Sequence, residues 1–463
     1  MNEGSDRDEI DDIAKACATA LETAGMSAAA AAAKRDLFAR ATRRLESPAP
    51  VNARATRAFF VPGRLEVLGK HTDYAGGRSL ICPVERGICL VATPRDDECI
   101  RIVDAADGSA ATCQLDPDAT SQEGHWSNYP ATVARRVARN FSDAKRGADI
   151  AFASDLPPAA GMSSSSALMI ATFLAIADAN ALDRRDAYRR EIHGCEDLAG
   201  YLATVENGQD FGALSGERGV GTFGGSEDHT AILCGRAGQL SEYSFCPVRH
   251  ERSVPFADRY VFVIGVSGVA AEKGAAARAR YNRLSLMARQ ILDVWCDATG
   301  RVDRSLAAAV AHDALEPGRL RGLLRDSPDG AFTSDELLDR FSQFVEETCV
   351  IIPAACDLFA SGDGDLVALG PLVDRSQDAA ERLLGNQIDE TIALARSARS
   401  LGALAASAFG AGFGGSVWAL VPAEAAADFE ARWSSEYHGR FPAHAGASRF
   451  FPTRPGPAAQ RVA

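Results

Sequence analysis

Residue types that could carry out phosphate chemistry gather first at residues 63–77, GRLEVLGKHTDYAGG. This segment holds an arginine, a histidine and an aspartate between glycines, and it follows a strand-like apolar run, Phe59–Val61. Two glycine- and serine-rich segments come later, DLPPAAGMSSSSAL at 155–168 and SAFGAGFGGSVWAL at 407–420. Together the three segments predict a phosphate and sugar site that is assembled from distant parts of the chain.

The serine-rich segment places Gly161 and four serines between a predicted strand, 149–153, and a strongly apolar helix, 166–179. A helix N-terminus offers unpaired N–H groups and a positive dipole end, which suit a phosphate chain. The segment lacks the Gly-Lys-Ser/Thr of a Walker loop. Its hydroxyls would bond phosphate oxygens or complete a Mg²⁺ shell. The alternative is an ordinary serine N-cap.

The three segments resemble the three signature motifs of the GHMP kinase superfamily. The first is similar to the galactokinase pattern GR-x-N-x-x-G-E-H-T-D-Y-N, and the resemblance covers roughly residues 58–425 in matching order and spacing. It implies an α+β, two-lobed GHMP kinase fold with mixed sheets and helices. It also implies an active site in the cleft between the lobes, where ATP and a sugar meet.

The resemblance assigns catalysis to Arg64 and Asp228. Asp228 lies in GGSEDH, which is similar to the family's G-x-M-D-Q. Phosphoryl transfer to an alcohol needs in-line positioning, neutralised phosphate charge and a group that accepts the hydroxyl proton. A carboxylate beside a guanidinium meets these needs, because the arginine keeps the aspartate ionised. Glu227 is the rival carboxylate, and an isolated Glu-Asp pair is usually a solvated turn.

The resemblance also implies binding roles. His71, Asp73 and Tyr281 would contact the sugar, although His71 could be a buried imidazole and Asp73 a turn cap. The residues expected to bind ATP are Gly161, Met162, Ser163, Ser164, Ser165, Trp126, Gly412 and Gly414. Ser165 and Glu206 would hold Mg²⁺. The alternative for Trp126 is a core residue.

Lys70 stands where the galactokinase pattern has a glutamate that resembles a ligand of the sugar's hydroxymethyl group. A carboxylate accepts a hydrogen bond from that hydroxyl, whereas an ammonium group only donates. One hypothesis is therefore a sugar with its own carboxylate, such as a uronic acid, bound by Lys70. The alternative is a neutral hexose, with Lys70 bonded to Asp73 or another carboxylate. Glu66, which replaces the usual asparagine, is one candidate partner.

The interval between Glu206 and Asp228 is longer than in the family. The glycine-rich segment 207–227 is interpreted either as a mobile lid that excludes water from ATP or as a surface insertion.

Composition limits the partners and the compartment. The formal net charge of −13 argues against nucleic acid or anionic membranes as partners. The eleven cysteines are dispersed and form no CxxC, which predicts reduced thiols. The acidic N-terminus does not resemble a signal peptide, and no apolar run approaches the ~20 residues of a membrane span. We expect a cytoplasmic protein, monomeric or weakly dimeric.

Four parts are predicted along the chain. They are a helical N-terminal extension (1–57) broken near Gly25, an N-terminal lobe (58–240), a C-terminal lobe (241–454) and a disordered tail (455–463). Short strands predominate after residue 58, as in a mixed or antiparallel sheet.

The sequence therefore predicts an ATP- and Mg²⁺-dependent kinase that phosphorylates the anomeric hydroxyl of a hexose, galactose or a related sugar. The alternatives are a kinase for uronic acids or other modified sugars that uses Lys70, a non-catalytic sugar sensor, and a kinase for a non-sugar alcohol. The HTDY segment argues against the last, because it resembles the sugar-binding branch.

Overall fold

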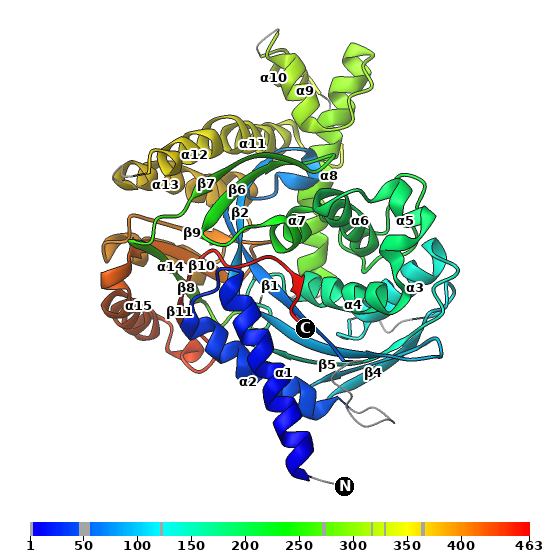
Figure 1. Ribbon diagram of the computed structural model, residues 1–463. Helices are drawn as coiled ribbons and strands as arrows, with labels where there is room; N and C mark the ends of the chain where they lie inside the picture. Colours follow the sequence, from blue (N-terminus) through cyan, green and yellow to red (C-terminus); the bar gives the residue numbers. More distant parts are fainter. Residues whose placement is uncertain are drawn as a thin grey trace.

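The structure is a computed structural model that describes residues 3–45, 56–120, 124–270, 275–315, 318–327, 330–362 and 366–463. Two sheets organise it, and helices cover their outer faces (Figure 1). The first sheet runs in the order β12-β1-β2-β5-β3-β4, with β6 and β7 added beside β2. All of its strand pairs are antiparallel except β3 with β5. Its strands are β1 (Arg57–Leu68), β2 (Arg78–Pro94), β3 (Cys99–Asp104), β4 (Ala110–Gln114), β5 (Ala148–Ser154), β6 (Gln239–Ser244), β7 (Arg249–Pro255) and β12 (Gln460–Arg461).

The two faces of the first sheet are covered by different helices, because side chains alternate along each strand. Phe60, Val91 and Ala151 face the N-terminal helices α1 (Glu3–Thr23) and α2 (Ala28–Arg44). Phe59 and Leu90 belong instead to the main core beneath the remaining helices of this lobe. Those helices are α3 (Asn128–Asn140), α4 (Ser164–Asn180), α5 (Asp186–Glu191), α6 (Cys195–Asn207) and α7 (Glu227–Cys234). The predicted N-terminal helical extension is thus present and packs on the sheet.

The second sheet runs β11-β8-β10-β9 and is antiparallel throughout. One face packs against two helices through Val263, Val417 and Trp433, and the other face contributes Phe262 and Trp418 to the main core. The two lobes therefore share one core. The elements are β8 (Tyr260–Val266), β9 (Ala405–Phe409), β10 (Ser416–Pro422), β11 (Arg449–Thr453), α12 (Ile352–Ala360), α13 (Leu369–Ala379), α14 (Asp389–Ser400) and α15 (Ala426–Arg440).

Four helices that follow β8 in the chain form an arm, and α9 and α10 project at the top of Figure 1. A core of its own holds the arm together, with Ile291, Leu320 and Phe344 at its centre. The helices are α8 (Ala275–Thr299), α9 (Leu306–Asp313), α10 (Arg319–Arg325) and α11 (Ser334–Val345). The base of the arm reaches the first lobe, because Ala75 packs in the same cluster.

Two predicted boundaries were wrong. The tail is ordered: Gln460 and Arg461 pair with Phe60 and Phe59, and the Ala58 amide donates to the Ala463 carbonyl at 3.0 Å. The edge of β1 offers unpaired backbone groups, and the tail satisfies them. The lobe boundary predicted at 240 is also displaced, because β6 and β7 remain in the first sheet and the second begins with β8.

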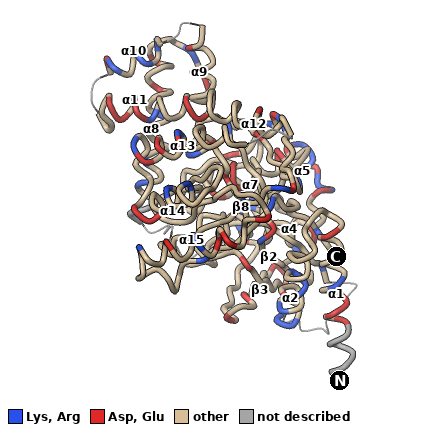
Figure 2. The backbone as a smooth tube through the Cα atoms, turned by 90° about the vertical axis from the view of Figure 1, so that its left-hand side faces the viewer, with Lys and Arg blue, Asp and Glu red and all other residues tan. Residues whose placement is uncertain are grey.

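Charged residues of both signs are spread along the described chain in Figure 2, so the net charge of −13 is distributed over many elements. Across the described ranges, none of the helices has the length and apolar character needed to cross a bilayer.

Candidate active site

One cleft collects side chains from all three sequence segments. Its walls come from β1 and the turn after it, the N-terminus of α4, the end of α6, the start of α7, helix α8 and the loop before β10. Most of the predicted site residues line it. They are Arg64, His71, Asp73, Gly161, Ser163, Ser164, Ser165, Glu206, Asp228, Tyr281 and Gly412.

Arg64 and Asp228 are in direct contact. Arg64 projects from β1, and its Nε donates to Asp228 Oδ1 at 2.8 Å, while Glu227 Oε1 lies 3.7 Å from the same nitrogen. A second guanidinium nitrogen donates to the Gly161 carbonyl. Burial would lower the pKa of Arg64, but the carboxyls of Asp228, Glu227 and Glu66 outweigh it and raise that pKa. The guanidinium is thus fixed and charged between a carboxylate and the serine-rich loop.

The side chain of Asp228 is 33% exposed, whereas that of Arg64 is only 5% exposed. Asp228 is the second residue of α7, so the start of a helix sets its position. One carboxylate oxygen takes the bond from Arg64, and the other lies 3.5 Å from the Ser166 hydroxyl at the cleft. A bound alcohol can therefore reach Asp228 without displacing the arginine.

Ser166 belongs to the site, and the sequence interpretation did not include it. Its hydroxyl donates to Glu206 Oε2 at 2.9 Å, and His229 Nε2 lies 3.5 Å from the same oxygen. Glu206, Ser166 and Asp228 thus form one oxygen-rich group, and Ser165 lines the cleft beside it. The signal was present in the sequence as the fourth serine of SSSS, one helical position beyond the assigned one.

Asp73 is buried against the segment that precedes α7. Its Oδ2 accepts from the Glu227 amide at 3.2 Å. A Cβ atom at Gly225 would lie 2.4 Å from that oxygen, so the close approach requires glycine there. Burial raises the pKa of Asp73, and the hydrogen bonds from backbone amides oppose that effect.

Two further carboxyls, Glu66 and Glu227, are buried at the floor of the cleft and hydrogen-bond each other. Burial raises the pKa of Glu66 to about 7, against the opposing charges of Arg64 and Lys70. Burial also raises the pKa of Glu227 well above its usual range. Both carboxyls are buried, so Asp228 is the exposed one of the two carboxyl groups that lie next to the Arg64 Nε.

His71 is a neutral imidazole at the wall of the cleft. Burial lowers its pKa to about 4. Its Nε2 donates to the Ala411 carbonyl at 3.0 Å, so its Nδ1 accepts from the Tyr74 hydroxyl at 3.1 Å. The ring of Tyr281, from α8, lies 5.2 Å from the His71 ring and lines the cleft. The His71 and Tyr281 rings form an aromatic wall of the cleft that can lie against a sugar ring.

The two glycine-rich loops meet across the cleft. A Cβ atom at Gly410 would lie 3.0 Å from the Gly161 carbonyl, and Gly410 has φ +79°, which favours glycine. Ser163 and Ser164 line the cleft at the N-terminus of α4, where N–H groups have no partner within the helix. The geometry suits an anion at this end of the cleft.

Lys70 does not line the cleft. Its side chain is buried, and its Nζ donates to Ser407 Oγ at 2.6 Å and to Ser376 Oγ at 3.1 Å, both in the C-terminal lobe. The Lys70–sugar contact is therefore not supported by this geometry. The alternative, a bond to Asp73 or another carboxylate, also differs from what is found, because its hydrogen-bond acceptors are hydroxyls.

Three residues expected at the nucleotide lie outside the cleft lining. Trp126 packs against Phe152 with ring centroids 6.1 Å apart and joins the edge of the main core. Met162 is buried in that core, and its carbonyl accepts from the Arg64 amide. Gly414 lies close to the carbonyls of residues 269 and 270.

Segment 207–227 is attached to the body at both ends. Arg135, in α3, binds Glu217 through two contacts of 2.9 Å, and Arg136 donates to the Gln209 carbonyl at 2.8 Å. Residues 222–225 approach the cleft, and Thr222, Gly224 and Gly225 line it. The first part of the segment therefore packs on α3, and the last part is a wall of the site.

Comparisons with known families match three parts of the chain. The model described as "GHMP kinases N terminal domain" matches residues 128–216, and "GHMP kinases C terminal" matches 352–439. The "Galactokinase galactose-binding signature" matches residues 51–94. The chain belongs to the GHMP kinase superfamily.

Within that superfamily the chain is a galactokinase-like sugar kinase. It is 27% identical over 389 residues to a galactokinase of Chloroflexus aggregans, a match that covers 82% of this chain and 88% of the relative. A galactokinase of Actinobacillus pleuropneumoniae is 33% identical over 120 residues, 25% of this chain and 30% of the relative. The structure of Lactococcus lactis galactokinase complexed with galactose aligns with a TM-score of 0.70 at 22% identity, covering 88% of this chain and 95% of that one.

Proposed function

We propose that the protein transfers the terminal phosphoryl group of ATP to the anomeric hydroxyl of a neutral hexose, galactose or a close relative. The observation that carries this proposal is the Arg64–Asp228 contact of 2.8 Å inside a cleft that also holds the His71 and Tyr281 rings. A sugar against those rings can present a hydroxyl to Asp228.

Asp228 accepts the proton of the attacking hydroxyl. Arg64 keeps the carboxylate ionised and extends positive charge toward the transferring phosphoryl group. Burial raises the pKa of both Glu66 and Glu227, which favours their protonated forms and reduces the negative charge that would repel the phosphates. The triphosphate lies at the N-terminus of α4, between the loops of Gly161 and Gly410.

A magnesium ion fits the donor set at the other side of Asp228. Carboxylate and hydroxyl oxygens are the ligands that this hard cation prefers, and Glu206, Ser165 and Ser166 supply them. Bound there, Mg²⁺ would neutralise charge on the phosphate oxygens. Glu206 and Ser166 already hydrogen-bond each other, so the chain orients its oxygens before the ion arrives.

The site supports a neutral sugar over a uronic acid, because the Lys70 ammonium is directed to Ser376 and Ser407 and away from the cleft. A non-catalytic sensor would have no need of the paired arginine and aspartate. We further propose that the protein acts in the cytoplasm, as a monomer or a weak homodimer.

The test is ADP release from ATP in the presence of Mg²⁺ and a panel of neutral hexoses, aminosugars and uronic acids. We expect release with neutral hexoses, and an acid-labile product whose ³¹P spectrum is that of a sugar 1-phosphate. Sugar and ATP binding without ADP release would favour the sensor. Preferential turnover of uronic acids would overturn the assignment of a neutral sugar.

A further inference from the structure

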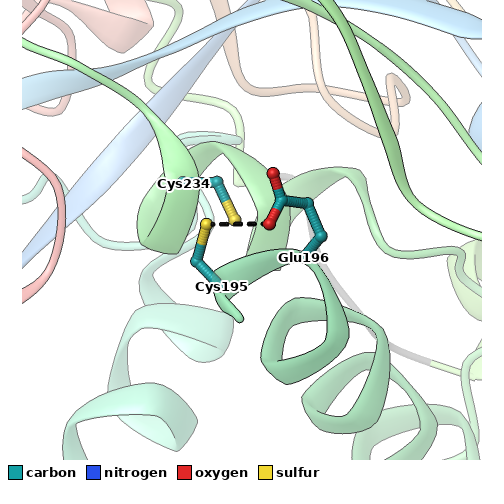
Figure 3. A group of neighbouring side chains, drawn as sticks. All are labelled: Cys195, Glu196 and Cys234. Atoms are coloured by element: carbon teal, nitrogen blue, oxygen red, sulfur yellow. Dashed lines mark hydrogen bonds between the residues drawn. The ribbon is translucent and has the colours of Figure 1, made fainter. Parts of the chain in front are cut away.

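A second cluster of reactive side chains lies at the other ends of two helices that form the cleft. It consists of Cys195, Glu196 and Cys234. One sulfur or oxygen donor from each residue lies within 4.8 Å of the other two, and Cys195 Sγ is 3.2 Å from Glu196 Oε2. Figure 3 shows the three side chains pointing toward one another from α6 and α7. None of the three lines the cleft.

The cluster joins an antiparallel pair of helices. Helix α6 begins at Cys195 and carries Glu206 near its end, whereas α7 begins at Glu227 and ends at Cys234. The Glu206 carboxylate lies near α7 at the cleft, 3.5 Å from His229 Nε2. The thiols of Cys195 and Cys234 lie close together at the other end of α6 and α7. A bond or ion that links the two sulfurs would therefore hold these two helices together.

The surroundings of the cluster suit a ligand that enters from solvent. Cys195 is exposed, whereas Cys234 is buried with 8% of its surface accessible. A hydrogen bond from Cys234 lowers the pKa of Cys195, and the same bond, with burial, raises the pKa of Cys234. Two sulfurs and a carboxylate oxygen thus share a small space, where one cation could bind all three as ligands.

We propose that Cys195, Glu196 and Cys234 form a binding site for a thiophilic divalent cation of the zinc class. Two sulfurs and one carboxylate oxygen are ligands that zinc accepts, and the exposed side leaves the fourth tetrahedral position to water. Magnesium is excluded by the sulfur ligands, because it prefers oxygen. On binding, each thiol releases its proton to solvent and its sulfur bonds the cation, with no change of oxidation state.

The cation would cross-link the first turn of α6 to the last turn of α7. Since these helices carry Glu206 and Asp228, the ion would stabilise the positions of both carboxylates from a distance. The expected effect is on stability, so the melting temperature of the protein should rise with added zinc.

A disulfide between Cys195 and Cys234 is the competing interpretation. Formation of this disulfide would need an oxidant, and Glu196 would take no part in it. The variant Glu196→Gln separates the two ideas, because it removes a metal ligand and leaves both thiols intact.

The experiment uses the reduced, untagged full chain after treatment with a chelator. Cadmium is titrated while the sulfur-to-cadmium charge-transfer band is recorded, and zinc is then added in competition with a chromophoric chelator. We expect one equivalent of cation per chain. Cys195→Ser should abolish the band from this site, and Glu196→Gln should weaken zinc binding by at least about tenfold.

Cys349→Ser is the matched control, because Cys349 is also exposed and lies outside the cluster. It should bind cadmium and zinc as the parent does. The proposal fails if Cys195→Ser retains the parental band, or if the control loses it. It also fails if Glu196→Gln binds zinc as tightly as the parent. If peroxide treatment then removes two thiols from both proteins, the disulfide is the better interpretation.

Discussion

Two buried cations from one segment of the chain, Arg64 and Lys70, have different surroundings. Arg64 contacts Asp228 and borders the cleft. Lys70 lies beneath the cleft and donates to Ser376 and Ser407 of the other lobe. The type of charge does not decide the role. The partners of each charged group decide its role. Arg64 contacts a partly exposed carboxylate, whereas Lys70 donates to buried hydroxyls.

The two surroundings also indicate different roles, one in the reaction and one in holding the two lobes together. Glu347 accepts from Ser376 and from the Gly69 amide, so Lys70 belongs to a buried polar network that joins the lobes. Such a network stabilises the structure only while every member has a partner. We therefore expect changes at the Arg64 pair to affect turnover, and changes at Lys70 to affect folding.

The largest effect is expected from Asp228→Asn. An amide cannot accept the hydroxyl proton, so kcat should fall by about 10²–10⁴-fold, while the affinity for a non-hydrolysable ATP analogue stays the same. Steady-state ADP release and calorimetric titration measure the two quantities. Asp96→Asn is the control, since it removes the same charge from an exposed position. Parental turnover in Asp228→Asn would remove this aspartate from the mechanism.

Lys70→Glu should come next and should act on stability. The new carboxylate would be buried beside Glu347 and Glu66, at a cost of about 3–5 kcal/mol in the free energy of unfolding, measured in urea. Lys70→Met should lower the free energy of unfolding by less than Lys70→Glu does, and it should keep the parental sugar preference. A stable Lys70→Glu protein with a changed sugar preference would return Lys70 to the sugar site.

Conservative exchanges at the two positions sharpen the comparison. Arg64→Lys keeps the charge but loses the planar fork that contacts Asp228 and Gly161, so kcat should fall about tenfold or more with little change in stability. Lys70→Arg overfills a closed site and should cost about 1–3 kcal/mol of unfolding free energy with kcat retained. Equal effects of both exchanges on kcat would contradict the division of roles.

The smallest effect is expected in the pH dependence of stability. Glu66 has a pKa of about 7 in the folded protein, above the usual value of 4.5, so the folded state binds the extra proton. Its contribution to stability is complete below pH 4.5 and is lost as the pH rises through 7. Glu66→Gln should therefore flatten the denaturation profile between these values.

Lys70→Met should shift the same profile upward in pH, because the lysine charge helps to ionise Glu66. Urea midpoints across the pH range measure both changes. An unshifted profile would show that Lys70 and Glu66 are not coupled.

The fold was predicted from the sequence because the three motifs and the strand pattern are local signals. The contact between Arg64 and Asp228 was also predicted, because phosphoryl transfer requires that pair of groups. Ser166 was missed, since neighbouring serines differ only in which way the start of α4 turns them. Lys70 was placed in the cleft because its partners, Ser376 and Ser407, lie far along the sequence and form no motif.

The tail was misread for a related reason. Residues 455–463 are rich in proline and alanine, and they are held by distant parts of the chain: β1, the Pro83 carbonyl and the Ile232 carbonyl. A strand of two residues has no pattern that a sequence interpretation can use.

The pairing of β12 with β1 has a consequence for synthesis. β1 is synthesised long before β12. The edge of β1 that pairs with β12 therefore stays unpaired while the residues between these two strands are synthesised. During that time the exposed backbone groups of Phe59 and Phe60 can pair with a neighbouring nascent chain. The N-terminal lobe therefore matures only after translation has passed both lobes, and chaperone protection of this border would matter most in that interval.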